Sequence, residues 1–259
     1  MFLWLKELRV QCRRNNRWND EWAFKVHEFG DLMMSILKTT PSLNELLEAV
    51  KAAGSGDSDF FGFPCRADGL YLQQDPEEYA AFVHFAATQI PPAELSLEIG
   101  IASGGQTKFL RDYWRSRRTL IVDIGQHALF HHWARIKKDV KSDICLELID
   151  DSHSGRVREQ LLPYAKQVDL AFVDGDHSYA GLRKDIFLTK ELLRPGGYMV
   201  LHDTAAVGDL QRIFNELLYS KDFTLVRNFQ NRFGISVWKM IRVKHMPNAF
   251  NRMTGWGRI

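Results

Sequence analysis

Cysteine is scarce in this sequence: only three occur among 259 residues, at positions 12, 65 and 145. Their odd number and wide spacing exclude a disulfide framework and a closely spaced pair of thiolate metal ligands. No run of about 18 uncharged apolar residues occurs, which excludes a transmembrane helix. The apolar N-terminus is interrupted by Lys6, Glu7 and Arg9, so we expect no signal peptide and a cytoplasmic protein.

Acidic residues are absent from the end of the chain, residues 223–259, where seven Lys and Arg residues occur. The remainder then has 27 basic and 32 acidic residues, although the whole chain has a net charge of +2. A basic tail on an acidic body is compatible with a membrane surface, a nucleic acid or a phosphorylated substrate. A solvated terminal face is the simpler interpretation, because charged residues usually lie at the surface.

The composition is that of a folded protein. Hydrophobic residues make up 45% of the chain and charged residues 25%, so disorder is excluded for most of it. The length suits one large domain with an appendage. Residues 1–70 are interpreted as a helical extension that acts as a cap or in oligomerisation. Ser42 and Glu45 have the spacing of a capping box, and Asp75-Pro76 predicts the start of another helix.

From residue 95 onward, short apolar runs alternate with segments of helical length, which predicts a parallel α/β sheet covered on both faces. The expected strands are residues 95–99, 119–122, 144–149, 168–173, 198–201 and 233–239. The expected helices are one that runs through Phe109, Leu110 and Tyr113 after a glycine-rich turn, and residues 127–138, 155–165, 179–193 and 209–220. Four of the strands end in acidic residues. Ligands of such sheets bind beyond the carboxyl ends of the strands, so these acids predict a site.

A glycine-rich turn follows the first of these strands, in the sequence LEIGIASGGQT. Gly100, Gly104 and Gly105 permit a tight turn and a close approach of a ligand to the backbone. Their spacing differs from the G-x-G-x-x-G of dinucleotide enzymes. Glu98 before the turn suits a ligand with a cationic amino group, and Asp123 lies where an acid accepts ribose hydroxyls.

This turn resembles the first motif of class I S-adenosylmethionine-dependent methyltransferases. The resemblance implies a Rossmann-like, doubly wound, mostly parallel seven-stranded sheet in residues 71–240, with a basic tail in residues 241–259. It also implies that Glu98 faces the methionine amino group and that Asp123 holds the ribose. Asp151 and Ser152 would lie near the adenine. The methionine part would be wrapped by Gly100, Ala102, Ser103, Gly104, Gly105 and Gln106.

A second informative segment spans residues 172–204 and places Asp174, Asp176 and His177 after one strand and His202-Asp203 after the next. Asp174 and Asp203 would end neighbouring strands, so their oxygens would converge as ligands for a hard divalent cation. An imidazole at His177 is a natural general base. Asp176 is expected to stabilise the following turn, and Lys184 and Asp185 to lie on a solvated helix face.

The segment resembles the group that contains macrocin O-methyltransferase, rhamnosyl O-methyltransferases and the cephalosporin hydroxylase family. The resemblance implies that Asp174 and Asp203 hold a metal and that His177 is the catalytic base, with Asp174 also at the cofactor. This chain departs from the group at His202, where an imidazole replaces one carboxylate of an acidic pair. Magnesium is the expected ion, and the imidazole also admits manganese, iron or another softer ion. The alternative is that the site holds no catalytic metal.

The resulting prediction is a metal-assisted O-methyltransferase that uses S-adenosylmethionine to methylate a hydroxyl of a sugar or natural-product-like small molecule. The alternative is a cofactor-binding protein of the same fold with a lost or different activity. A nucleic-acid substrate is not expected, because acids rather than a polar-Pro-Pro-aromatic sequence follow the fourth strand. Peripheral membrane contact through the basic tail and homo-oligomerisation stay open. Phe60, Phe61, Phe63 and Tyr71 are interpreted as core packing, with an aromatic lid over the acceptor as the alternative.

Overall fold

The computed structural model describes residues 41–54 and 69–241, all within one compact unit, Pro41–Ile259. The expected N-terminal segment before residue 41, the aromatic residues at positions 60, 61 and 63, and the basic tail after residue 241 lie outside this range. None of the helices in the described ranges is long and apolar enough to cross a bilayer.

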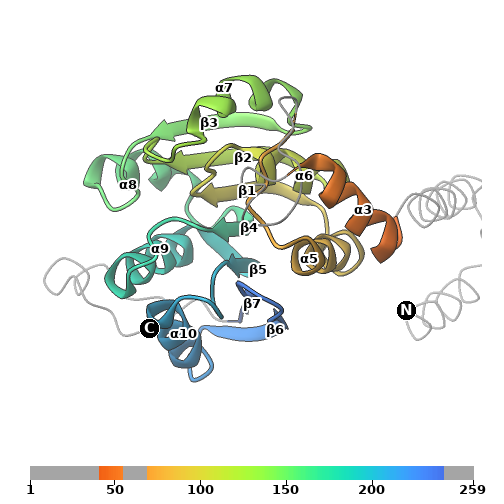
Figure 1. The fold of residues 1–259 in the computed structure, drawn as a ribbon. Helices are drawn as coiled ribbons and strands as arrows, with labels where there is room; N and C mark the ends of the chain where they lie inside the picture. Colours follow the sequence, from red (N-terminus) through yellow and green to blue (C-terminus); the bar gives the residue numbers. More distant parts are fainter. Residues whose placement is uncertain (1–40, 55–68, 242–259) are drawn as a thin grey trace, which may run out of the picture. The chain divides into compact units, whose positions relative to one another are not determined.

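The centre of the molecule is a seven-stranded sheet with the strand order β3-β2-β1-β4-β5-β7-β6 (Figure 1). Strands β1 to β5 are parallel, and β7 runs antiparallel to both β5 and β6. The Rossmann-like, mostly parallel sheet expected from the sequence is therefore confirmed. The strands are β1 (Ala93–Ile99), β2 (Ser116–Asp123), β3 (Asp143–Ile149), β4 (Val168–Val173), β5 (Leu193–Leu201), β6 (Phe223–Phe229) and β7 (Ile235–Met240).

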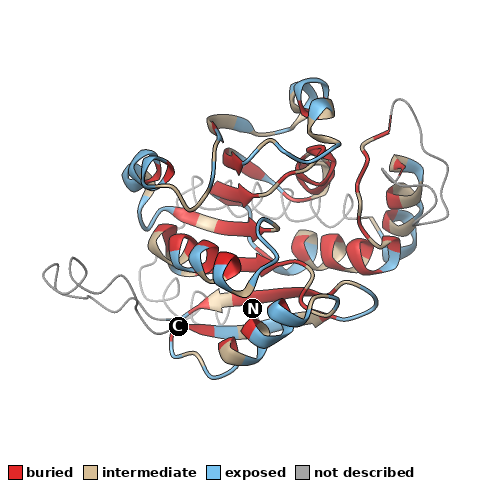
Figure 2. Cartoon of the chain, turned by 60° about the vertical axis from the view of Figure 1, so that its left-hand side comes forward, coloured by how far each residue is buried: buried red, intermediate tan, exposed pale blue. Residues whose placement is uncertain are grey.

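Helices cover both faces of the sheet and bury most residues of its central strands (Figure 2). One face packs against α8 (Gly155–Leu161), α9 (Tyr179–Leu192) and α10 (Gly208–Leu217). The other face packs against α3 (Leu43–Ala53), α5 (Pro76–Gln89) and α6 (Gly105–Tyr113). Successive strand residues alternate between the two cores: Ala171 and Val173 lie in the first, and Phe172 lies in the second. This two-sided burial explains why the parallel strands are continuous apolar runs.

Local signals place the helix starts as expected. Ser42 accepts a hydrogen bond from the Glu45 amide, and Glu45 accepts one from the Ser42 amide, which completes the predicted capping box of α3. Asp75 caps α5, with Pro76 in its first turn, where the missing amide hydrogen costs nothing.

Two expectations about the elements were wrong. The helix predicted over residues 127–138 is broken into the 3₁₀ turn Phe130–His132, the short helix α7 (Trp133–Ile136) and the 3₁₀ turn Lys137–Asp139. Strand β6 was not predicted, because its residues are mostly exposed or half-buried and lack a continuous apolar run. Strand β6 forms one edge of the sheet, opposite β3, and pairs only with β7.

Candidate active site

The strand order changes direction between β1 and β4, because the chain leaves β1 toward β2 and later returns to the other side of β1. Ligands of open α/β sheets bind at such a switch point, beyond the carboxyl ends of the strands. A cavity of about 400 Å³ lies there. Its walls are residues 71–74, the glycine-rich turn, the ends of β4 and β5, His127 and Phe233.

The glycine-rich turn needs its glycines for reasons of space. Gly100 and Gly104 have φ angles of +80° and +81°, which side chains disfavour. A Cβ at Gly104 would overlap the ring of Trp133, and one at Gly105 would overlap the Leu70 carbonyl. The turn thus packs so closely on its surroundings that only part of it faces the cavity: Gly100, Ile101, Ala102, Ser103 and Gln106.

Glu98 does not lie where the sequence predicted. Its side chain is 1% exposed, and its carboxylate is paired with Arg111 and accepts a hydrogen bond of 2.6 Å from the Thr107 hydroxyl. It is absent from the cavity wall formed by the described residues. Glu98 points into the layer between the sheet and α6, where its negative charge neutralises the buried guanidinium of Arg111. The structure therefore gives no support to the expected contact of Glu98 with a ligand amino group.

Asp123 lies at the end of β2, as predicted, and its carboxylate is occupied by the backbone. One oxygen accepts from the Ile101 amide at 2.7 Å and the other from the Gly125 amide at 2.6 Å. Each oxygen keeps a second lone pair, but Asp123 is 7% exposed and, like Glu98, is absent from the cavity wall formed by the described residues. Asp151 is half exposed beyond β3, and the Ser152 hydroxyl donates to Asp185 at 2.7 Å.

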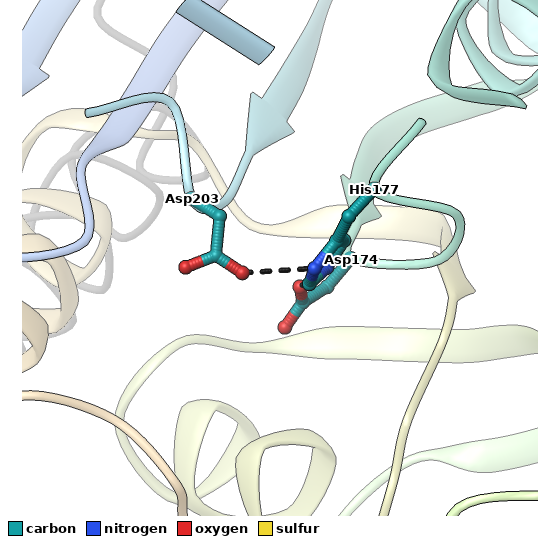
Figure 3. Close-up of side chains that lie close together, drawn as sticks. All are labelled: Asp174, His177 and Asp203. Atoms are coloured by element: carbon teal, nitrogen blue, oxygen red, sulfur yellow. Dashed lines mark hydrogen bonds and ion pairs between the residues drawn. The ribbon is translucent and has the colours of Figure 1, made fainter. Parts of the chain in front are cut away.

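The predicted catalytic residues come together. Asp174 follows β4, Asp203 follows β5, and His177 reaches over both from the loop before α9 (Figure 3). Nε2 of His177 lies 3.3 Å from Oδ1 of Asp174 and 3.3 Å from Oδ2 of Asp203. One ligand atom from each of the three residues lies within 4.8 Å of the others, a separation that a single metal ion can bridge.

His202 approaches the same two carboxylates from the protein side. Its Nδ1 lies 3.3 Å from Oδ1 of Asp174 and 3.3 Å from Oδ2 of Asp203. The ring is 5% exposed and lies between Phe172 and Phe233, with ring centroids 6.4 Å and 6.0 Å away. Two oxygens and two imidazoles therefore face one another, a donor set that fits Mg²⁺ through oxygen and also suits ions that accept nitrogen.

These contacts shift the pKa values of the cluster. Burial alone would lower the pKa of His202, but the carboxylates of Asp174 and Asp203 outweigh burial and raise it to about 10. Burial alone would raise the pKa of Asp174, but His202 and His177 hold it well below its usual range. The hydrogen bond to Asp174 raises the pKa of His177. The carboxylates thus favour the protonated form of the imidazoles, and a divalent cation bound by the carboxylates would compete with these protons.

The backbone around the cavity is strained. Five described residues other than glycine have positive φ angles, and four of these line the cavity: Tyr71, Gln73, Ala102 and Asp203. Such conformations cost free energy and cluster at functional sites. At Asp203 the conformation is held by the neighbouring turn, where Thr204 and Ala205 donate backbone hydrogen bonds to residues 234 and 233.

Three contributors were missed or misjudged in the sequence. Gln74 is 4% exposed and lines the cavity, but a glutamine in a polar segment before a helix gives no signal of this. Asp185 was expected on a solvated face and is fully buried, because α9 turns it toward Ser152 and His153. Glu78 of α5 accepts from the amides of Phe233 and Gly234 at 3.0 Å and 2.8 Å and so fixes one wall.

The chain was compared with known proteins. Residues 97–204 match a family described as a methyltransferase domain, and no curated protein matches the chain. A solved structure of the O-methyltransferase TomG from Streptomyces achromogenes, involved in tomaymycin synthesis and in complex with SAM, is 16% identical. It covers 76% of this chain and 90% of its own, with a TM-score of 0.49. An rRNA methylase from Streptococcus thermophilus is 13% identical and covers 64% of this chain and 97% of its own, with a TM-score of 0.48.

The matched residues run from β1 to just past β5 and include the glycine-rich turn and every acid of the cluster. At TM-scores below 0.5, the solved structures add nothing to the fold described above. Residues 97–204 are therefore similar to a methyltransferase domain, and the sheet that they contribute to is Rossmann-like.

Proposed function

We propose that this protein is a metal-assisted O-methyltransferase that transfers the methyl group of S-adenosylmethionine to a hydroxyl of a small molecule such as a sugar or glycosylated metabolite. The observation that carries this proposal is the position of Asp174, His177 and Asp203. They line the same cavity as the glycine-rich turn, so a methyl donor held by the turn lies beside groups that activate a hydroxyl. This is the chemistry implied by the resemblance of residues 172–204 to the macrocin and rhamnosyl O-methyltransferase group.

The metal would be held by the carboxylates of Asp174 and Asp203, with His202 as the nitrogen ligand. When bound, a divalent cation supplies Lewis-acid activation, which lowers the pKa of a coordinated hydroxyl. The donor set of two carboxylates and an imidazole favours Mg²⁺ less strongly than an all-oxygen set and admits Mn²⁺.

The chain's own residues supply the proton transfer and the alignment. His177 is 46% exposed, lies on the cavity wall, and can accept the proton of an acceptor hydroxyl. Asp174 fixes the imidazole through the contact at 3.3 Å and stabilises the imidazolium that forms. Bound S-adenosylmethionine would supply the methyl group, and transfer of this group to the acceptor oxygen would leave the bonding electron pair on sulfur as a neutral thioether. Holding both reactants in one cavity accounts for much of the expected rate enhancement.

The second candidate is a protein that binds the cofactor but does not transfer methyl groups to hydroxyls. The observation that favours it is His202, which stands where the resemblance implies a carboxylate of a metal-binding pair and is buried beneath the cluster. The two candidates differ in their need for a metal during turnover and share the cofactor site.

Calorimetric titration of S-adenosylmethionine into chelator-treated protein, repeated with Mg²⁺ and Mn²⁺, tests the proposal. We expect micromolar cofactor binding and a separate metal heat that Asp174→Asn and Asp203→Asn both abolish. Asp176→Asn is the matched control, because this carboxylate accepts from the Ser178 amide at 2.8 Å and lies outside the three-residue cluster. Absence of cofactor binding under every condition would overturn the proposal. Cofactor binding without any metal heat would favour the second candidate.

A further inference from the structure

A buried carboxylate in the first turn of α5 holds the loop between β6 and β7, residues 230–234. Glu78 is 1% exposed, and its two oxygens accept hydrogen bonds from the backbone amides of Phe233 and Gly234, at 3.0 Å and 2.8 Å. Burying a carboxylate is costly unless its oxygens are hydrogen-bonded. Hydrogen bonds to an ionised oxygen are about twice as strong as those between neutral groups. A buried charge used in this way indicates that the position of the β6–β7 loop matters.

The β6–β7 loop is in backbone contact with the turn that carries Asp203. The amides of residues 204–206 donate to the carbonyls of Phe233 and Gly234, at 2.7, 3.0 and 3.1 Å. Gly234 has a φ of +91°, and a Cβ at this position would lie 2.3 Å from the Ala205 nitrogen. No side chain of Gly234 separates the two segments, so a shift of the loop must displace the turn as well.

Asp203 depends on such support, because its own backbone is strained. Its φ is +58°, and a conformation of this kind persists only where the surrounding structure fixes it. Its Oδ2 atom lies 3.3 Å from Nε2 of His177 and 3.3 Å from Nδ1 of His202. Contacts of this length are lost when the two groups move apart by a few tenths of an ångström. The chain of contacts that begins at Glu78 therefore ends at the metal-binding cluster.

The other acid of the cluster is supported from a different direction. Asp174 follows β4, and its amide donates to the carbonyl of Ile99 in β1 at 2.8 Å. This contact lies next to the glycine-rich turn and does not involve the β6–β7 loop. Displacing the loop would thus move Asp203 relative to Asp174 and leave the glycine-rich turn in place. Glu78 is absent from the cavity wall formed by the described residues, so it acts through the backbone and not on a ligand.

We propose that Glu78 is a positioning residue of the metal site, which holds Asp203 where its carboxylate and that of Asp174 can bind one divalent cation. This inference rests on the proposed function and extends the metal site to a side chain that touches neither metal nor cofactor. It requires that loss of the Glu78 carboxylate weakens metal binding selectively, because the glycine-rich turn does not depend on the β6–β7 loop.

Separate calorimetric titrations of Mn²⁺ and of S-adenosylhomocysteine into the chelator-treated full chain test this requirement. We expect Glu78→Gln to weaken Mn²⁺ binding about tenfold, as loss of a residue that supports a metal ligand does, and to change S-adenosylhomocysteine binding less than about twofold. The carboxamide keeps the shape of the side chain but offers one acceptor oxygen to two amides. Asp169→Asn is the matched control and should leave both affinities unchanged. Its carboxylate also accepts from two successive backbone amides, those of Glu94 and Leu95, but at the amino ends of β4 and β1.

The pattern across variants and ligands decides the role of Glu78. Weakening of both ligands by Glu78→Gln, equal loss of Mn²⁺ binding in Asp169→Asn, or unchanged Mn²⁺ binding in Glu78→Gln would overturn the inference. Thermal unfolding shows whether each variant is folded at the temperature of the titration. Should Glu78→Gln not be folded, Glu78→Asp replaces it, since it keeps the charge and moves the carboxylate by one methylene; the same selective loss is expected.

Wild-type protein separates failure of the inference from failure of the proposed function. If it binds no Mn²⁺, metal assistance fails and the role of Glu78 fails with it. If it binds neither ligand, the proposed methyl-transfer activity fails as well. If it binds both and the Glu78 variants do not discriminate between them, only the positioning role is lost.

Discussion

Gly100 and Asp174 touch where β1 and β4 end: a side chain on Gly100 would overlap the backbone carbonyl of Asp174. The Asp174 amide also donates a hydrogen bond to the Ile99 carbonyl at 2.8 Å. The ends of β1 and β4 are therefore held together by this hydrogen bond and by the packing of Gly100 on the Asp174 carbonyl. The first glycine of the glycine-rich turn thus packs directly on the backbone that carries Asp174, the first acid of the cluster.

Gly100→Ala should therefore destabilise the protein and disturb both parts of the site. The φ of +80° alone costs about 1–3 kcal/mol for a residue with a side chain, and the overlap with Asp174 adds to this. Thermal unfolding and cofactor titration measure the effect. Gly155→Ala is the control, since nothing lies within 4 Å of a Cβ at that position. It should be neutral or stabilise by up to about 1 kcal/mol. Equal effects of both substitutions would contradict the contact.

Glu98 and Arg111 should behave as a buried structural pair. Arg111→Met leaves a carboxylate uncompensated in the core and should cost about 3–5 kcal/mol of unfolding free energy. The double variant Glu98→Gln with Arg111→Met removes both charges and should recover part of this loss in chemical denaturation. The folded double variant should bind S-adenosylmethionine as the wild type does. A loss of affinity of tenfold or more would restore Glu98 as a ligand contact.

Asp185 should contribute to the stability of the protein, although the sequence places it on a helix face that was expected to be solvent-exposed. Asp185→Ala removes the acceptor for the Ser152 hydroxyl and the partner that lies 3.2 Å from His153 Nε2. Leaving such groups unpaired costs about 1–3 kcal/mol. Asp185→Asn keeps the acceptor for Ser152 and should cost less. Urea unfolding compares both with the exposed neighbour variant Lys184→Ala, which we expect to change stability by less than about 0.5 kcal/mol. A similarly small effect of Asp185→Ala would show that the contacts are not stabilising.

The metal-free protein should lose stability as the pH rises from 6.5 toward 10. The pKa of His202 is raised from its ordinary value of 6.5 to about 10 by Asp174 and Asp203, against the opposing effect of burial. A group whose pKa is higher in the folded than in the unfolded protein contributes its full stabilisation of the folded state at pH values below the unfolded-state pKa. This contribution is lost as the pH rises through the folded-state pKa. Thermal unfolding with chelator should show a falling midpoint over this window. His202→Gln should flatten the slope, whereas His84→Gln, which lies on α5 outside the cluster, should retain it.

The sequence by itself determined the layers of the fold and the edge where the site lies. Short apolar runs that alternate with helical segments are typical of a parallel sheet covered by helices on both faces. An acid directly after a buried strand lies at the carboxyl end of that strand, where ligands of such sheets bind. For the same reason Asp174, His177 and Asp203 could be expected to meet. The caps of α3 and α5 were also predictable, because they depend on residues three or fewer apart.

Only the tertiary structure decided how the polar side chains are used. The direction in which Glu98 points depends on Arg111, which α6 brings beside β1, and the burial of Asp185 depends on how α9 lies on the sheet. Gln74 becomes part of the cavity because the segment before α5 is fixed to the glycine-rich turn by Ser103, 32 residues away from Tyr71 in sequence. A buried polar group takes its role from the partners that packing supplies, and those partners lie far away in the sequence.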